Sequence, residues 1–115
     1  MSNRNAKPKK VKIKRGSGNV FADLGFADAA DRLAKANLAH RIGAVIKREG
    51  LTQAQAAKRL GIDQPKVSML VRGRLKDFST ERLMHFLVML GQDVVIDVRE
   101  PQDKSHPSMK VLVEV

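Results

Sequence analysis

The sequence has no cysteine, tryptophan or tyrosine, and four phenylalanines are its only aromatic residues. Without a thiol the chain can form neither a disulfide nor a thiolate metal site, and it has no cysteine nucleophile. Every apolar run falls short of the roughly 20 residues that span a bilayer, and no apolar segment follows the basic N-terminus as in a secretory signal. We therefore expect a cytoplasmic protein whose 115 residues form one domain around an aliphatic, alanine-rich core.

Positive charge is concentrated in two stretches of a chain whose formal net charge is +10. Residues 1–15 carry seven Lys and Arg residues and no acid, and residues 51–76 carry six with Asp63 as their single acid. Residues 91–115 hold three basic and five acidic residues instead. Such basic stretches favour a polyanionic partner, because binding releases condensed counterions. For residues 1–19 two interpretations stay open: an arm that contacts DNA or an acidic partner, and a flexible solubilising tail.

Helical periodicity begins at Phe26 and ends near Glu49, where a glycine follows. The apolar stripe shifts near Asn37, which predicts either one long helix kinked there or two abutting helices. A later helix is predicted from the N-cap residue Ser79 to Gly91. Both stretches have apolar residues every three or four positions, so each helix is expected to bury one face.

Two short helices are predicted between these, at residues 53–60 and 64–71. The first starts at a capping box formed by Thr52 and Gln55, and Asp63 is the expected N-cap of the second. Three residues, beginning with Gly61, join the two helices, so the helices must cross sharply and pack closely. Small or apolar residues stand where such a crossing needs them: Ala56, Ala57, Leu60, Ile62, Val67 and Leu70.

The stretch Leu51–Gly73 resembles, without gaps, the helix-turn-helix unit of the lambda-repressor/Cro-like regulators. The wider stretch Ser17–Arg99, which begins SGNVFADLGFADAADRLAKA and ends LGQDVVIDVR, is similar to the Xre-type antitoxins of type II toxin–antitoxin operons. The resemblance implies a mainly α-helical, lambda-repressor-like bundle that binds a palindromic operator in double-stranded DNA as a homodimer. It also implies a RelE/HigB-like toxin as a partner. A solitary Xre-family repressor with no toxin partner is the alternative.

In this family the second helix lies in the major groove, so the resemblance divides the outer residues into two groups. The base-reading positions are Gln64, Lys66, Ser68 and Met69. The positions that hold the DNA backbone are Thr52, Gln53, Pro65, Arg72, Arg74 and Lys76. The Gln64 amide can pair with N6 and N7 of adenine, and Lys66 can donate to guanine or to a phosphate. Because Pro65 offers no side-chain hydrogen bond, DNA shape is expected to contribute to recognition.

After Gly91 the apolar period becomes 2, which predicts strands at Val94–Val98 and Met109–Val115 joined by a loop. The predicted organisation is a flexible basic arm (1–19), a helix-turn-helix domain (20–91) and a C-terminal β element (92–115). Pairing of the first strand between two chains would form a dimer through Val94, Val95, Ile96 and Val98. The alternative is a hairpin that packs on its own domain.

Residues that can carry other chemistry have simpler explanations. The three histidines, His40, His85 and His106, lie in different elements without metal-ligand spacing, so no metal site is expected. Acidic residues Asp28 and Asp31 are explained by the positive end of a helix dipole. We therefore expect no enzyme, no catalytic residue and no cofactor. A purely structural pair of helices is the alternative to DNA binding. A toxin is expected to meet Phe21–Ala36 or the arm.

Overall fold

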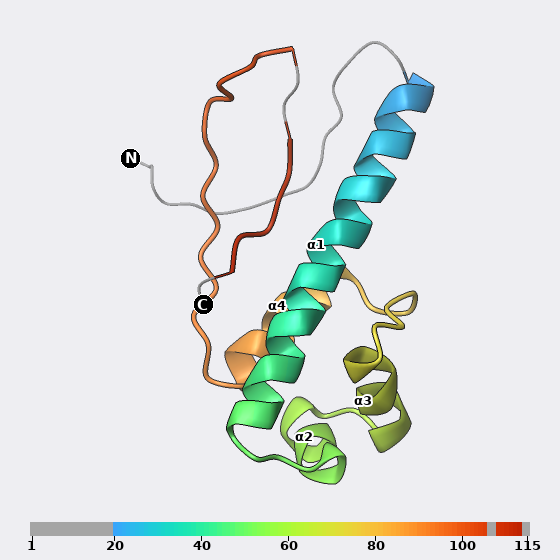
Figure 1. Cartoon of the computed structure of the whole chain (residues 1–115), viewed down its shortest axis with the longest axis vertical. Coiled ribbons are helices and arrows are strands. Elements are labelled where there is room, and N and C mark those ends of the chain that lie inside the picture. The colour runs from blue at the N-terminus through green and yellow to red at the C-terminus, as the bar shows by residue number, and fades with distance from the viewer. Residues whose placement is uncertain (1–19, 106–107, 114–115) are drawn as a thin grey trace. The chain divides into compact units, whose positions relative to one another are not determined.

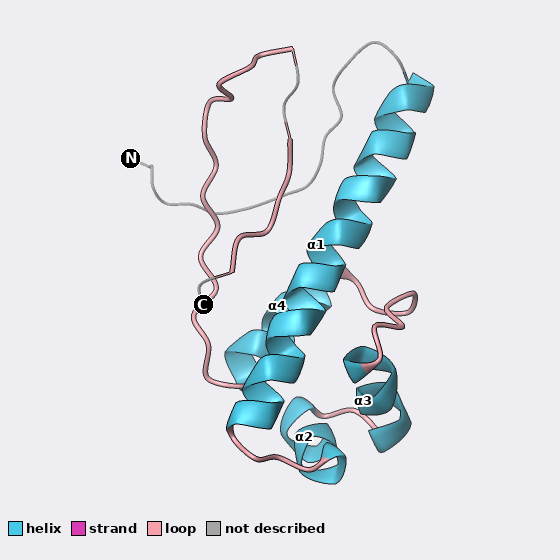
Figure 2. Cartoon of the chain, viewed as in Figure 1, coloured by secondary structure: helices cyan, strands magenta, loops and turns pink. Residues whose placement is uncertain are grey.

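A computed structural model describes residues 20–105 and 108–113 of the chain, with side chains from residue 28 onward (Figure 1). The predicted basic arm, residues 1–19, lies outside the described residues. Four helices form the regular structure of the described part: α1 (Val20–Arg48), α2 (Gln53–Leu60), α3 (Gln64–Val71) and α4 (Thr80–Met89) (Figure 2). This confirms the mainly helical fold. None of the described helices is long and apolar enough to cross a membrane.

The first helix is continuous through Asn37, so the prediction of two abutting helices there is wrong. It also begins earlier than the predicted start at Phe26. Asn37 lies within this helix, and its side-chain Nδ2 donates to the carbonyl of Val111, 3.2 Å away. A half-buried amide that is satisfied in this way costs little free energy. The bond joins residues 74 positions apart, and helical periodicity contains no sign of such a partner.

The chain divides into two compact units, which we describe separately. One unit is Ala34–Val94 with the C-terminal residues from Val111 onward, and the other contains the residues up to Leu33 with Val95–Lys110. The hydrophobic core belongs to the first unit, which also contains α2, α3, α4 and the part of α1 from Ala34 onward.

The core of this unit receives one face from each helix. Its buried residues are Leu38, Ile42, Val45 and Ile46 of α1, Ala56, Ala57 and Leu60 of α2, Val67 and Leu70 of α3, and Leu83, Phe86, Leu87 and Leu90 at α4. The core is mostly aliphatic, as predicted, but it also contains two aromatic rings. Phe78 and Phe86 are 1% and 3% exposed, with ring centroids 6.1 Å apart in an edge-to-face arrangement. Such pairs add about 0.5–1.5 kcal/mol beyond their buried area.

The helices α2, α3 and α4 all begin in the same way. At each start the side-chain oxygen of the N-cap residue accepts a hydrogen bond from the backbone N–H three residues later. The N-cap residues are Thr52, Asp63 and Ser79, and the three bonds measure 3.0, 3.0 and 3.1 Å. These bonds confirm the three predicted N-caps. Each cap lies between an apolar residue before it and a core residue four positions after it: Leu51 and Ala56, Ile62 and Val67, Phe78 and Leu83. This spacing is that of the hydrophobic staple, which fixes the angle at which the chain enters a helix.

The turn between α2 and α3 depends on Gly61, whose φ of 70° lies in the left-handed region. That conformation lets the N–H of Ile62 reach back to the carbonyl of Ala57 at 3.1 Å, which closes α2. Ile62 is then directed toward the core, and Asp63 starts the next helix immediately. The predicted end of the helix at Gly61 is thus confirmed, and each of the three residues in the turn has a structural role.

Hydrogen bonds to α1 also fix the direction in which the chain leaves α4. The N–H of Gln92 donates to the carbonyl of Leu87 at 2.9 Å. The side-chain Oε1 of Gln92 accepts from Nε and Nη2 of Arg41 at 3.2 and 2.9 Å. Val94 packs against the core two residues later. Gln92, three residues after the end of α4, is therefore anchored to the first helix.

The predicted C-terminal hairpin is not confirmed, since residues 92–105 and 108–113, the described part of this region, contain no strand. The alternation is partly present: Val94 and Ile96 are half-buried, whereas Val95 is 80% exposed. The predicted period of 2 would place Val98 on the same side as Val94 and Ile96, but Val98 is 72% exposed. An extended segment becomes a strand only when a neighbouring segment pairs with it. Pairing between chains stays a prediction.

Replacing Gly61 by alanine should lower the free energy of unfolding by about 1 kcal/mol, because other residues are disfavoured in the left-handed region. An added Cβ would meet no atom within 4 Å, so the cost lies in the backbone alone. Gly43→Ala, inside α1 and equally free of neighbours, is the matched control and should stabilise by about 0.5–1 kcal/mol. Urea denaturation followed by circular dichroism measures both changes. Equal stability of wild type and Gly61→Ala would contradict the role of the turn.

Candidate DNA-binding surface

The helices α2 and α3 form a compact pair whose inner faces are locked in the core (Figure 1). Val67 and Leu70 of α3 are 0% and 1% exposed, and Ala56 of α2 is 0% exposed. The short turn and these buried contacts leave the opposite face of α3 available to a partner. The predicted geometry of a helix-turn-helix unit is therefore present in the described residues.

The outer face of α3 consists of two adjacent ridges. Gln64, Ser68 and Arg72 follow one another at a four-residue spacing, which places them on one side of the helix. Pro65 and Met69 form the neighbouring ridge at the same spacing. Gln64, Pro65 and Arg72 are exposed, whereas Ser68 and Met69 are half-buried, and Met69 also packs against the core.

Lys66 does not lie on the ridge of Gln64. Two residues along a helix correspond to about 200°, which takes Lys66 around to the side of buried Leu70. Its side chain is half-buried, and its Nζ lies 3.7 Å from Oδ2 of Asp63. The structure thus separates two residues that the sequence analysis placed together on the outer face. Val71 was not among the predicted residues, although it is 40% exposed and stands seven positions after Gln64.

The predicted backbone residues at α2 have different tasks. The Thr52 hydroxyl accepts the N–H of Gln55, and the N–H of Thr52 donates to the Gln55 amide oxygen at 2.8 Å. In this capping box the Thr52 side chain is used to stabilise the start of α2. Gln53, the first residue of α2, is half-buried and takes no part in the box.

Three exposed basic residues follow α3, as the sequence predicts: Arg72, Arg74 and Lys76. Arg72 donates from Nε to the carbonyl of Ser68 at 3.3 Å, and the N–H of Arg74 donates to Met69 at 2.9 Å. Both bonds close the end of α3 and hold the loop against it. Asp63, the single acid of residues 51–76, is occupied by the N-terminus of α3 and by Lys66. The surface that faces a partner is therefore positive.

One cation beside this surface was missed. The guanidinium of Arg82, near the start of α4, lies over the rings of Phe78 and Phe86, at 5.5 and 5.3 Å from their centroids. Arg82 and Phe86 are spaced four apart, which places them on one side of α4, and Phe78 immediately precedes the N-cap Ser79 of that helix.

Comparison with known proteins agrees with this geometry. Residues 20–99 match the model of a helix-turn-helix domain family. A solved structure named for the XRE family of transcriptional regulators is similar, with 46% sequence identity and a TM-score of 0.68. The similarity covers 76% of this chain and 98% of that one. No curated protein matched the sequence. The chain belongs to the helix-turn-helix family and is a DNA-binding transcriptional regulator of the XRE type.

Proposed function

We propose that this regulator binds a palindromic operator as a dimer, with α3 in the major groove and Gln64 as its main base contact. The observation that carries the proposal is the outer ridge of Gln64, Ser68 and Arg72, of which Gln64 and Arg72 are exposed, on a helix whose other side is fixed in the core. A Gln amide on a rigid helix can form two hydrogen bonds with adenine. Gln64 is the first residue of α3, which is the end of a recognition helix that meets the bases.

The neighbouring residues complete the proposed interface. Ser68 and Met69 contact a base edge and a thymine methyl, and Lys66, on the flank, donates to a phosphate. The backbone is held by Gln53 at the start of α2 and by the basic residues after α3: Arg72, Arg74 and Lys76. Thr52 and Pro65 contribute through the shape of the two helix starts. Phosphate contacts position the helix, and few direct base contacts remain, so DNA shape adds to the specificity.

Gln64→Ala should reduce the preference for operator over random DNA by about 10- to 100-fold, the loss expected for one bidentate base contact. The operator is first selected from a random DNA library with the wild-type protein, and affinities are then measured by fluorescence anisotropy. Lys66→Ala is the comparison, because loss of a phosphate contact weakens binding to both DNAs alike. An unchanged preference in Gln64→Ala would move the base contacts to another part of the chain.

We propose that the dimer forms through residues 94–98. One helix-turn-helix unit makes few contacts, and dimers of such units occupy half-sites roughly 34–36 Å apart. The proposed interface, Val94, Val95, Ile96 and Val98, directly follows the anchored end of α4. Val95 and Val98 are exposed apolar side chains, which a second chain would cover.

The double variant Val95→Asp, Val98→Asp should sediment as a monomer, because like charges facing each other across paired strands oppose pairing. Both residues are exposed, so the circular dichroism spectrum should not change. Leu112→Asp, at a residue that is 83% exposed and outside the proposed interface, is the control and should remain a dimer. A double variant that still sediments as a dimer would exclude this interface.

We further propose that the regulator is an antitoxin that controls its own operon and binds a RelE/HigB-like toxin through Phe21–Ala36. The proposal rests on the resemblance of Ser17–Arg99 to Xre-type antitoxins. It is supported by Leu33, which is 59% exposed on α1 and lies outside the core of the DNA-binding unit.

The proposal requires a short basic RelE-like reading frame beside the gene, and a tagged chain co-expressed with that frame should retain its product during purification. Leu33→Asp should reduce the retained amount at least tenfold, because it places a charge in the proposed apolar contact. Val88→Asp, at a residue that is 55% exposed on α4, is the matched control and should retain the toxin. A wild-type chain that retains no such product would favour the solitary repressor.

A further inference from the structure

The guanidinium of Arg82 is held on a rigid aromatic platform. Its Cζ lies 5.5 Å from the ring centroid of Phe78 and 5.3 Å from that of Phe86. The two rings meet edge to face and are almost completely buried, so the platform belongs to the core. Arg82 itself is exposed. A long side chain that usually samples many rotamers is thus restrained at one place before any partner arrives.

The charge of Arg82 is not neutralised within the described part of the chain, where no acidic side chain pairs with it. The adjacent Glu81 is directed to His85, with 3.9 Å between its Oε2 and Nε2 of the imidazole. A guanidinium that rests on ring faces keeps the N–H donors at its edge available for acceptors in its plane. Oxygen atoms of a phosphate diester fit such a planar donor set.

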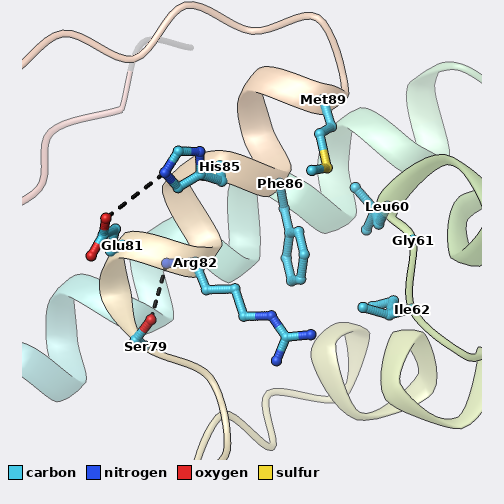
Figure 3. Close-up of a pocket in the computed structure, with 9 residues that line it drawn as sticks. All are labelled: Leu60, Gly61, Ile62, Ser79, Glu81, Arg82, His85, Phe86 and Met89. Carbon is cyan, nitrogen blue, oxygen red and sulfur yellow. Dashed lines mark hydrogen bonds and ion pairs between the residues drawn. The ribbon is translucent and has the colours of Figure 1, made fainter.

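A hollow of about 330 Å³ adjoins this guanidinium (Figure 3). One side is formed by the turn between α2 and α3, at Gly61 and Ile62, and the other by Ser79 and residues of α4, which include Glu81 and its partner His85. Arg82 extends past the ring of Phe86 in the direction of Ile62 (Figure 3). Ile62 precedes Gln64 by two residues, so the hollow lies beside the start of α3.

We propose that Arg82 binds a phosphate of the DNA backbone at this hollow. The inference rests on the binding of DNA by α3. When the start of α3 enters the major groove, the phosphates that border the groove pass beside the turn that precedes it. A cation fixed at this place adds a contact from α4 to those made by Gln53 and Arg74. It therefore sets the position of α3 and does not select a base.

The salt dependence of DNA binding tests this assignment, because each lost phosphate contact lowers the slope of log K against log salt by about 0.9. The probe is a fluorescent random-sequence duplex of roughly 30 base pairs, long enough for a dimer on two half-sites. Arg82→Gln should lower the slope by about one contact per chain, and Arg82→Lys should leave it close to wild type. Arg59→Gln is the control, since it removes the same charge from α2, where Arg59 pairs with Glu49 at 3.5 Å.

An unchanged slope in Arg82→Gln, or an equal decrease in Arg59→Gln, would overturn the proposal. Thermal melting shows whether Arg82→Gln remains folded. Should it unfold, the wild-type protein is measured instead on selected operators in which one phosphate at a time is replaced by an uncharged methylphosphonate. If none of these replacements beside the groove bound by α3 lowers the affinity, the contact is overturned. A wild-type protein without salt-dependent DNA binding would instead contradict the function, which keeps the two failures distinct.

Discussion

The three-residue turn between α2 and α3 determines what the rest of the surface can do. Gly61 ends one helix, Ile62 packs against the core and Asp63 begins the next helix, so each residue has one task. The angle between the helices therefore cannot adjust without loss of a cap or a core contact. Because Val67 and Leu70 are fully buried, the outward direction of α3 is a property of the fold. Binding then loses less conformational entropy, since the contact surface exists beforehand.

The parts of this fold that sequence reasoning predicted well are those that depend on neighbouring residues. The helices at 53–60 and 64–71 have the predicted bounds, because caps and glycine stops involve residues no more than five apart. Phe78 depends on the same local logic but was missed. It precedes the cap Ser79 as Leu51 and Ile62 precede theirs, and this repeated spacing would have placed it in the core.

The remainder required information that one chain's local pattern does not contain. The bond from Asn37 to Val111 joins distant residues, and no periodicity encodes its partner. The proposed strand at Val94–Val98 needs a second segment, so a single sequence cannot specify what pairs with it. The position of Lys66 could have been predicted, because a residue two positions after Gln64 on a helix cannot lie on the same face as Gln64.

The anchored exit from α4 has a consequence for how two copies would measure DNA. Arg41 holds Gln92 by two hydrogen bonds, and Val94 is already packed two residues later. In a pair of chains joined beyond this point, the direction in which each chain leaves α4 would determine the distance and rotation between the two recognition helices. One base pair added between half-sites turns one of them by about 35° around the DNA axis. A stiff exit cannot follow that rotation, so the interval between half-sites would be selected as strictly as the bases within them.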